Sequence, residues 1–361
     1  MEKINKWEDI EQHFLSGSLI LGNGASIAVS DSFNYDSLYL EAQHRDYLNA
    51  FSVSVFKSFK ANDFEFVLRN LLQAKQVNQV LNIDCTLIDS AYINIRDALI
   101  RTLRDIHISY SEALPHLPSI YNFMRLFKTV ASLNYDLIVY WAAMLGNHEL
   151  GRWFKDCFTP YYLDEDWEKY LEPIGEASGA TLFFYPHGNL VLHREDFLTR
   201  KIITRPDLYT HDLLNEILSC WEKNAFIPVF VCEGRQDGKV RSISNSSYLD
   251  RVFYEVLPNL ESKLVIYGWS IGQQDQHIIE QIKKAELSRV AVSVFREDKE
   301  YMERVKRIFS RIGVQDVIFF DAESPGAWNN PSRKSPDCGE FDFKIDLKEG
   351  EKLTSLRRFY D

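Results

Sequence analysis

Ser18-Leu-Ile-Leu-Gly-Asn-Gly-Ala-Ser26 joins a short apolar run to a Gly-x-Gly turn, and this junction indicates the fold class. A strand that ends in such a turn brings backbone N–H groups close to a phosphate at the start of a helix. Ile27 stands where the dinucleotide-binding fingerprint has its third glycine. The stretch therefore predicts either a nucleotide-binding turn or an ordinary strand–turn–helix whose glycines supply positive φ angles.

Similar apolar runs recur along the chain and alternate with amphipathic helices. They are Val130–Leu133, Thr181–Tyr185, Ile227–Cys232, Leu264–Tyr267, Val290–Phe295 and Val317–Phe320. Apolar residues at helical spacing fill about 36–128 instead, which predicts a helical insertion. The pattern predicts an α/β fold with a Rossmann-like, mostly parallel sheet and helices on both faces. We expect one domain over 1–330 and a tail over 331–361, in which Phe341–Ile345 could add an edge strand.

Composition excludes several classes of protein. The 361 residues are 45% hydrophobic and 14% aromatic, which predicts a large packed core, and the net charge of −11 argues against a nucleic-acid-binding surface. The sequence has no apolar leader and no apolar run of about 18 residues, so we expect neither a signal peptide nor a membrane span. The five scattered cysteines form no CxxC pair, which predicts reduced thiols, a cytoplasmic protein and no metal.

Polar residues at three further strand ends are candidates for chemistry. His187 lies in Pro186-His-Gly188, where a tight turn could expose it as a general base, although a structural histidine is the alternative. Asn134 could orient a ribose hydroxyl or a water molecule, or it could simply occupy a turn. Asp136 is expected to cap a helix that ends at Gly146-Asn147.

The fourth strand end is Gly268-Trp-Ser270, where backbone and hydroxyl groups could bind ribose or phosphate. We expect Asp275 to cap the following helix and His277 to be exposed in its first turn. A further polar loop could serve a diphosphate, a partner or only solvent; it comprises Cys232-Glu-Gly-Arg-Gln236 with Lys239, Arg241 and Asn245.

Taken in chain order, these strand ends resemble the sirtuin-like domains of bacterial antiphage defence proteins, which are distant relatives of the protein-deacetylating sirtuins. Four segments carry the resemblance. Gly22–Ser26 is similar to the family's Gly-Ala-Gly-x-Ser loop, Ser132–Asp136 to its Thr-x-Asn-x-Asp motif, His187-Gly188 to its catalytic His-Gly, and Leu264–Ser270 to its Val-Gly-x-Ser loop.

The resemblance implies NAD as substrate, with cleavage of its nicotinamide–ribose bond to nicotinamide and ADP-ribose. Asn134 and His187 would be catalytic, and Phe33 or Tyr35 would cover the nicotinamide. The other implied NAD-binding residues are Gly22, Asn23, Gly24, Ser26, Asp136, Gly268 and Ser270. The four-cysteine zinc module of the deacetylases is absent, which argues against deacylation.

An NAD hydrolase that acts in defence must be gated, so the resemblance also implies a homo-oligomer, an activating partner subunit or a nucleotide signal. The helical stretch 36–128 is the candidate assembly surface, although it could simply cover the sheet. Two other functions remain open at this point. One is a non-catalytic module that binds NAD or ADP-ribose, and the other is ADP-ribosyl transfer from NAD to a macromolecule.

Overall fold

A parallel sheet forms the centre of the protein in a computed structural model. The model describes residues 3–159, 162–195, 198–202, 213–223, 227–230, 239–240 and 243–332. Every pair of neighbouring strands in this 8-stranded sheet is parallel. In spatial order they are β1 (Ile4–Asn5), β13 (Val317–Asp321), β12 (Arg289–Val294), β11 (Lys263–Tyr267), β2 (Ser18–Leu21), β3 (Thr129–Ser132), β7 (Thr181–Phe184) and β4 (Phe154–Lys155).

The strand order is that of a doubly wound, Rossmann-like sheet. From β2 the chain moves outward through β3 to β7, then returns to the other side of β2 and continues through β11, β12 and β13. The order therefore reverses between β2 and β11, which pair in the register Leu264↔Ser18. In sheets of this kind, ligands bind outside the carboxyl ends of the strands at the point of reversal.

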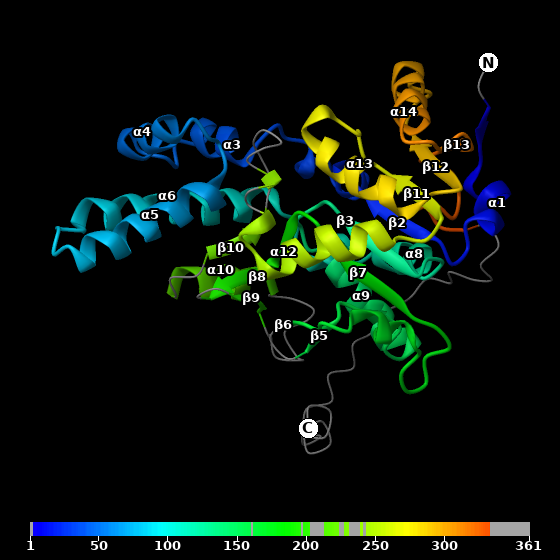
Figure 1. The fold of residues 1–361 in the computed structure, drawn as a ribbon, viewed down its shortest axis with the longest axis horizontal. Coiled ribbons are helices and arrows are strands. Elements are labelled where there is room, and N and C mark those ends of the chain that lie inside the picture. The colour runs from blue at the N-terminus through cyan, green and yellow to red at the C-terminus, as the bar shows by residue number, and fades with distance from the viewer. Residues whose placement is uncertain are drawn as a thin grey trace.

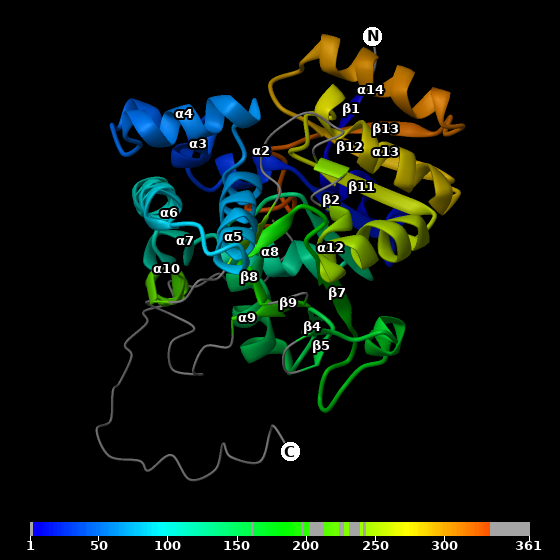
Figure 2. The same cartoon turned by 60° about the vertical axis from the view of Figure 1, so that its left-hand side comes forward.

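Helices cover the sheet, as predicted (Figures 1 and 2). All four residues of each of the strands β2, β3 and β7 are buried, as expected for parallel strands covered on both faces. The helices outside the insertion are α1 (Trp7–Ile10), α2 (Asn23–Ile27), α9 (Ile138–Leu150), α10 (Leu213–Lys223), α12 (Ser247–Arg251), α13 (Gln276–Ile282) and α14 (Lys299–Arg311).

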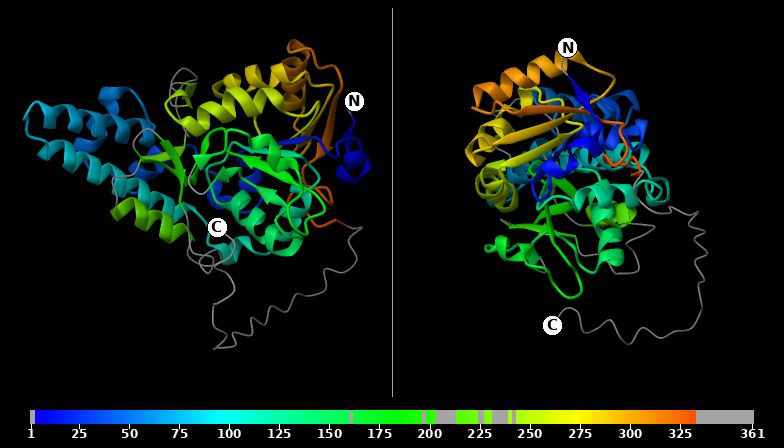
Figure 3. Two further views of the ribbon diagram at one scale, coloured as in Figure 1. Left: turned by 60° about the horizontal axis from the view of Figure 1, so that its bottom comes forward. Right: turned by 90° about the vertical axis from the view of Figure 1, so that its right-hand side faces the viewer.

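The predicted helical stretch forms six helices between β2 and β3. They are α3 (Leu38–His44), α4 (Ala50–Phe59), α5 (Phe64–Val80), α6 (Thr86–Ile106), α7 (Tyr110–Ala113) and α8 (Leu117–Met124). Asp63 begins α5 by accepting a hydrogen bond from the N–H of Phe66 at 3.1 Å. The α5–α6 pair projects away from the sheet, at the left of Figure 1 and in the left view of Figure 3.

One predicted strand belongs to a different sheet. The run that starts at Ile227 forms β10 (Ile227–Phe230), which pairs antiparallel with β8 (Gly188–Glu195) and leaves the parallel sheet without it. β8 also pairs antiparallel with β9 (Leu198–Lys201), for which the sequence pattern predicted no strand. Pro228 cannot donate to a ladder, and the register shifts between Pro228 and Phe230.

The predicted end of the helix after Asp136 is also wrong. α9 continues through Gly146 and Asn147 to Leu150, and Gly151 ends it with a φ of +64°. Gly146 serves packing, because a Cβ there would lie 2.4 Å from the Phe154 ring. The Asn147 side chain accepts a hydrogen bond from the N–H of Phe154 at 2.6 Å and donates one to the Phe154 carbonyl at 2.8 Å.

The last described residues are bound to the first glycine turn and the helix that follows it, and residues close before them contact the N-terminal segment. The Trp328 Nε1–H donates to the Ala25 carbonyl at 2.7 Å, and Asn329 donates to the Ala28 carbonyl at 2.8 Å. Near the N-terminus, the N–H of Trp7 donates to Ser324 Oγ at 2.9 Å. The predicted strand Phe341–Ile345 lies outside the described residues. Within the described ranges, every helix is too short or too polar to cross a membrane.

Candidate functional site

The four strand ends singled out in the sequence belong to four adjacent strands, β11, β2, β3 and β7. The turns after β2 and β11 touch directly. The N–H of Gly22 donates to the Tyr267 carbonyl at 3.0 Å, and the N–H of Gly24 donates to the Gly268 carbonyl at 2.7 Å. These two turns flank the point where the strand order reverses, so the predicted phosphate-binding loops lie where a Rossmann-like sheet binds its ligand.

Close approach of the two turns explains the glycines in the first of them. A Cβ on Gly22 would lie 2.4 Å from the Cα of Trp269, and one on Gly24 would lie 2.8 Å from the Cα of Gly268. Positive φ does not explain Gly22, whose φ is −113°. Gly268 does need its freedom, because its φ is +66°.

Ser26, Asn134 and Asp136 form one buried hydrogen-bond network under the first turn. The Asn134 side-chain amide donates to the Gly22 carbonyl at 3.0 Å and to Ser26 Oγ at 2.8 Å. The Ser26 hydroxyl in turn donates to Asp136 Oδ2. Residues more than 100 positions apart in sequence are therefore joined, as their common position at strand ends predicts.

Asp136 lies one residue before the N-cap of α9, which is Leu137 and not Asp136 as predicted, but its Oδ1 still accepts from the N–H of Ile138 in the first turn of α9 at 2.9 Å. A residue that the sequence did not single out supports it from the other side. Asn189 is fully buried and donates from its side-chain amide to the Asp136 carbonyl at 2.6 Å. Its position immediately after His187-Gly188 is the only sequence signal that could have indicated it.

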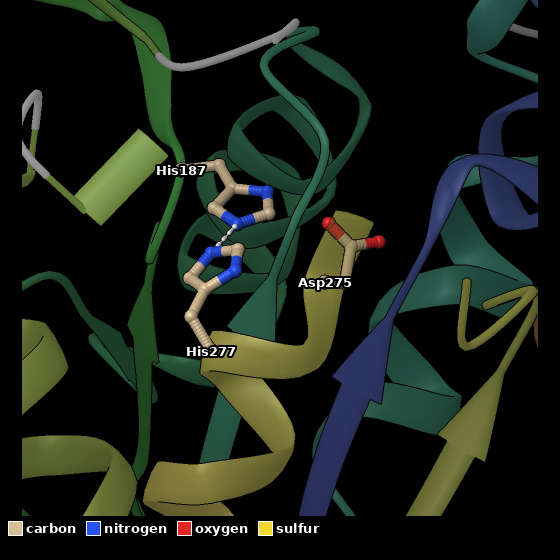
Figure 4. A group of neighbouring side chains, drawn as sticks. All are labelled: His187, Asp275 and His277. Atoms are coloured by element: carbon tan, nitrogen blue, oxygen red, sulfur yellow. Dashed lines mark hydrogen bonds between the residues drawn. The ribbon is translucent and has the colours of Figure 1, made fainter. Parts of the chain in front are cut away.

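His187 is buried, with 5% of its surface accessible, and not exposed as its turn suggested. One ring nitrogen bonds the backbone of Leu133, next to Asn134. The other, Nε2, lies 3.0 Å from Nε2 of His277 (Figure 4). The two rings are nearly parallel, with centroids 5.2 Å apart, and Phe253 stacks on His277 at 5.9 Å. His187 and Asn134 thus flank the same strand end.

The expectation of an exposed His277 is wrong, whereas Asp275 takes the predicted N-cap position of α13 but without the capping hydrogen bond. His277 is 1% accessible, and it enters the core because it lies at the start of α13 facing the end of β7. Asp275 precedes α13 but makes no capping hydrogen bond. Its Oδ1 accepts from Lys239 Nζ at 2.9 Å, and its Oδ2 accepts from Trp269 Nε1 at 3.0 Å.

Burial and charge determine the protonation of this cluster. Burial, the nearby Lys239 ammonium and His277 lower the pKa of His187 to about 3, although Asp275 opposes the shift. Burial and Lys239 also lower the pKa of His277 to about 4. Burial alone would raise the pKa of Asp275, but His187, Lys239 and Trp269 lower it. At neutral pH the cluster therefore holds two neutral imidazoles beside an ionised carboxylate.

The remaining predicted residues lie around this network. Asn23 and Ser270 are exposed at the two turns, and the Asn23 amide donates to the Phe33 carbonyl at 3.1 Å. Phe33 is 2% accessible, and its ring packs edge-on against His107 with centroids 5.3 Å apart. Arg241 and Cys232–Gln236 of the predicted polar loop lie outside the described residues.

Comparison with known proteins gives a family without an assigned activity. Among curated proteins, none matches the chain. A family model described as a domain of unknown function, DUF4917, matches residues 19–328, which include every strand of the central sheet except β1. The match covers most of the 361 residues. The chain therefore belongs to the DUF4917 family.

Proposed function

We propose that this protein is an NAD+ hydrolase, which cleaves the nicotinamide–ribose bond with water to give nicotinamide, ADP-ribose and a proton. One observation carries the proposal. The turns after β2 and β11, with Asn134 and His187 beside them, lie at the carboxyl ends of adjacent strands around the point of strand reversal. Dinucleotides bind at that position in Rossmann-like sheets, and the sirtuin-like resemblance concerns the same four segments.

Each group has a defined part in the proposed reaction. The rim formed by exposed Asn23 and Ser270 with half-buried Gly24 and Gly268 receives the pyrophosphate and ribose. Asn134 orients the ribose or the attacking water, and the Ser26–Asp136 pair fixes Asn134 in place. Positive charge develops on the ribose as the neutral nicotinamide leaves, and His187 accepts the proton from water. A general base whose pKa lies near the working pH contributes about 10²–10⁴-fold, so the pKa of His187 has to rise well above about 3 in the substrate complex for a contribution of this size.

His277 imposes a condition on this mechanism. His187 donates its one N–H to Leu133, so its Nε2 lone pair is the acceptor for the proton, and His277 occupies that acceptor. Base catalysis therefore requires water to replace His277 at His187 Nε2. The same contact favours a second candidate function, a non-catalytic module that binds NAD or ADP-ribose and keeps His187 as a buried structural residue.

The decisive test measures nicotinamide release from NAD and NAD binding separately. The purified chain is compared with His187→Ala and Asn134→Ala, alone and with lysate from phage-infected cells, because activity in a defence protein would be gated by assembly, a partner subunit or a nucleotide signal. His148→Ala, whose side chain is 83% exposed on α9, is the matched control.

Release that both site variants lose and the control keeps supports the hydrolase. Full release in folded His187→Ala and Asn134→Ala contradicts the site assignment. NAD binding without release under any condition supports the binding module, and label from NAD that ends on protein supports ADP-ribosyl transfer.

A further inference from the structure

We infer that His187, His277 and Asp275 form a binding site for a divalent transition-metal ion of the zinc class. Among the described residues, these three are the only group of histidine, cysteine or carboxylate side chains whose ligand atoms could share an ion, and those atoms all lie within 4.8 Å of one another. All three residues are buried, unlike the exposed acidic groups that gather on surfaces without a metal. Figure 4 shows the two imidazoles facing each other through their Nε2 atoms, with the Asp275 carboxylate beside them.

The two histidine nitrogens suit such an ion with little movement, whereas the Asp275 carboxylate, within 4.8 Å of them, has to move closer. Two nitrogen ligands of a tetrahedral Zn²⁺, each at about 2.0–2.1 Å, are separated by about 3.3 Å. The Nε2 atoms of His187 and His277 are 3.0 Å apart, so they need to separate by only a few tenths of an ångström. Two histidines and one carboxylate leave a fourth position for water, which is the donor set of open zinc sites.

The surrounding groups hold the ligands in the required orientation. Histidine ligands usually donate their second ring N–H to a carbonyl or carboxylate, and His187 bonds the backbone of Leu133 in this way. Phe253 stacks on the His277 ring and restricts its rotation. Trp269 Nε1–H donates to Asp275 Oδ2 at 3.0 Å, so the carboxylate is oriented as well. A chance contact between two histidines would not need these supports.

Lys239 is the competitor for this site. Its ammonium lies 2.9 Å from Asp275 Oδ1, and the pair is almost completely buried, with side-chain accessibilities of 6% and 10%. The carboxylate thus already holds a cation, which a divalent ion must displace. It follows that the metal-bound and metal-free states differ in the position of one lysine, and that removing Lys239 strengthens metal binding.

A bound ion would also regulate the proposed hydrolase, and this part of the inference rests on that function. The metal uses the Nε2 lone pair of His187, which is then no longer free to accept a proton. The metal-bound protein is therefore a resting form, and a chelator such as EDTA should release its activity. Metal binding itself depends only on the geometry of the three ligands.

The test uses Co²⁺ as a spectroscopic probe of the full chain, without NAD. Wild-type protein should bind one equivalent with the visible absorption of a tetrahedral site and should melt at a higher temperature when loaded. His277→Gln and Asp275→Asn should each weaken Co²⁺ binding by at least about tenfold, the lower end of losses seen even for outer-sphere changes. Lys239→Met should tighten it, and His148→Ala should leave it unchanged.

Absence of Co²⁺ binding, or equal affinity in wild type and Asp275→Asn, would overturn the metal site. Far-ultraviolet circular dichroism checks that each variant is folded. If His277→Gln does not fold, the metal site is still tested by the other two variants, because Co²⁺ binding should weaken in Asp275→Asn and tighten in Lys239→Met. A chain that binds Co²⁺ but, after chelator treatment, cleaves no NAD either alone or with lysate from phage-infected cells refutes the hydrolase alone. NAD cleavage by a chain that does not bind Co²⁺ refutes the metal site alone.

Discussion

The Nε2 atoms of His187 and His277 lie 3.0 Å apart, although 90 positions separate the two residues in the chain. The contact joins the end of β7 to the start of α13, and it buries both rings. Each histidine therefore limits what the other can do. His187 also bonds the backbone of Leu133, next to Asn134.

Replacement of the two histidines should have unequal effects on NAD cleavage. We expect His187→Ala to lower nicotinamide release by about 10²–10⁴-fold, the usual contribution of a general base. His277→Gln should lower nicotinamide release less than His187→Ala does, or raise it, because His277 contacts the base His187 and not the reacting atoms. Steady-state rates of chelator-treated proteins provide the comparison, and equal losses would mean that both residues meet the substrate.

Ser26→Ala should destabilise the fold by about 1–3 kcal/mol, since it removes a hydroxyl that serves two buried partners, Asn134 and Asp136. Urea unfolding measures the change, and Ser32→Ala, at an exposed position of the same segment, is the control with little expected effect. An equal response of the two variants would show that the network adds nothing to stability.

Gly24→Ala should separate the two turns. The new Cβ would lie 2.8 Å from both the Cα and the carbonyl oxygen of Gly268, neither of which can move without its strand. Overpacking of this kind costs about 1–3 kcal/mol, and NAD affinity should fall with stability. Calorimetric titration with NAD, combined with thermal unfolding, tests this. Unchanged values in both experiments would exclude a tight contact between the turns.

The ion pair between Glu65 and Arg69 on α5 should matter far more than the pair between Glu41 and Arg45 on α3. Arg69 and Glu65 are almost fully buried, at 8% and 4% side-chain accessibility, whereas Arg45 and Glu41 are at 38% and 25%. Glu65→Ala leaves a buried guanidinium without this partner, at a cost of about 3–5 kcal/mol. Glu41→Ala should cost about 0–1 kcal/mol. Chemical denaturation measures the free energy of unfolding of both variants. Similar losses in Glu65→Ala and Glu41→Ala would contradict a larger contribution of the buried pair.

Stability should fall in mild acid partly because of His107. This buried imidazole bonds the Ile108 carbonyl at 2.8 Å through Nδ1 and accepts from the N–H of Leu137 at 3.0 Å through Nε2, so only its neutral form fits. Burial lowers its pKa in the folded protein, with Asp136 opposing the shift. The folded state thus binds fewer protons than the unfolded state below about pH 6.5.

The stabilisation by neutral His107 is fully present above about pH 6.5 and is lost as the pH falls toward the lower folded pKa. We expect His107→Gln to be less stable at pH 7.5 and to lose less stability than wild type on going to pH 5. Other buried histidines shift in the same direction, so the difference between the two pH profiles isolates His107. Parallel profiles would disprove this role.

Much of the central sheet could be predicted because its strands are local signals. The runs that begin at Ser18, Leu264 and Val290 are continuous and apolar, as strands buried on both faces must be. The Ser26–Asn134–Asp136 network could also be anticipated, because parallel strands bring their carboxyl ends to one edge. The predicted Rossmann-like arrangement and helical insertion are confirmed.

Long-range pairing accounts for what could not be predicted. The run at Ile227 has the composition of a core strand, and only its partner β8 makes it antiparallel. His277 has the polar neighbours of an exposed first turn, and its burial depends on His187 and Phe253. The sequence predicted that Gly146 ends a helix. In the structure this glycine makes room for the Phe154 ring, which belongs to β4, and such a contact between two elements cannot be read from the local sequence.

Trp328 and Asn329 hold the first glycine turn from the other end of the described chain, with 303 positions between Trp328 and Ala25. A ribosome makes the chain from the N-terminus, so the turn emerges early and stays without these two hydrogen bonds until nearly the whole domain has been synthesised. A nascent chain or a truncated fragment therefore lacks these two supports of the glycine turn. For the NAD hydrolase proposed above, this order of assembly would delay activity until translation of the domain is finished.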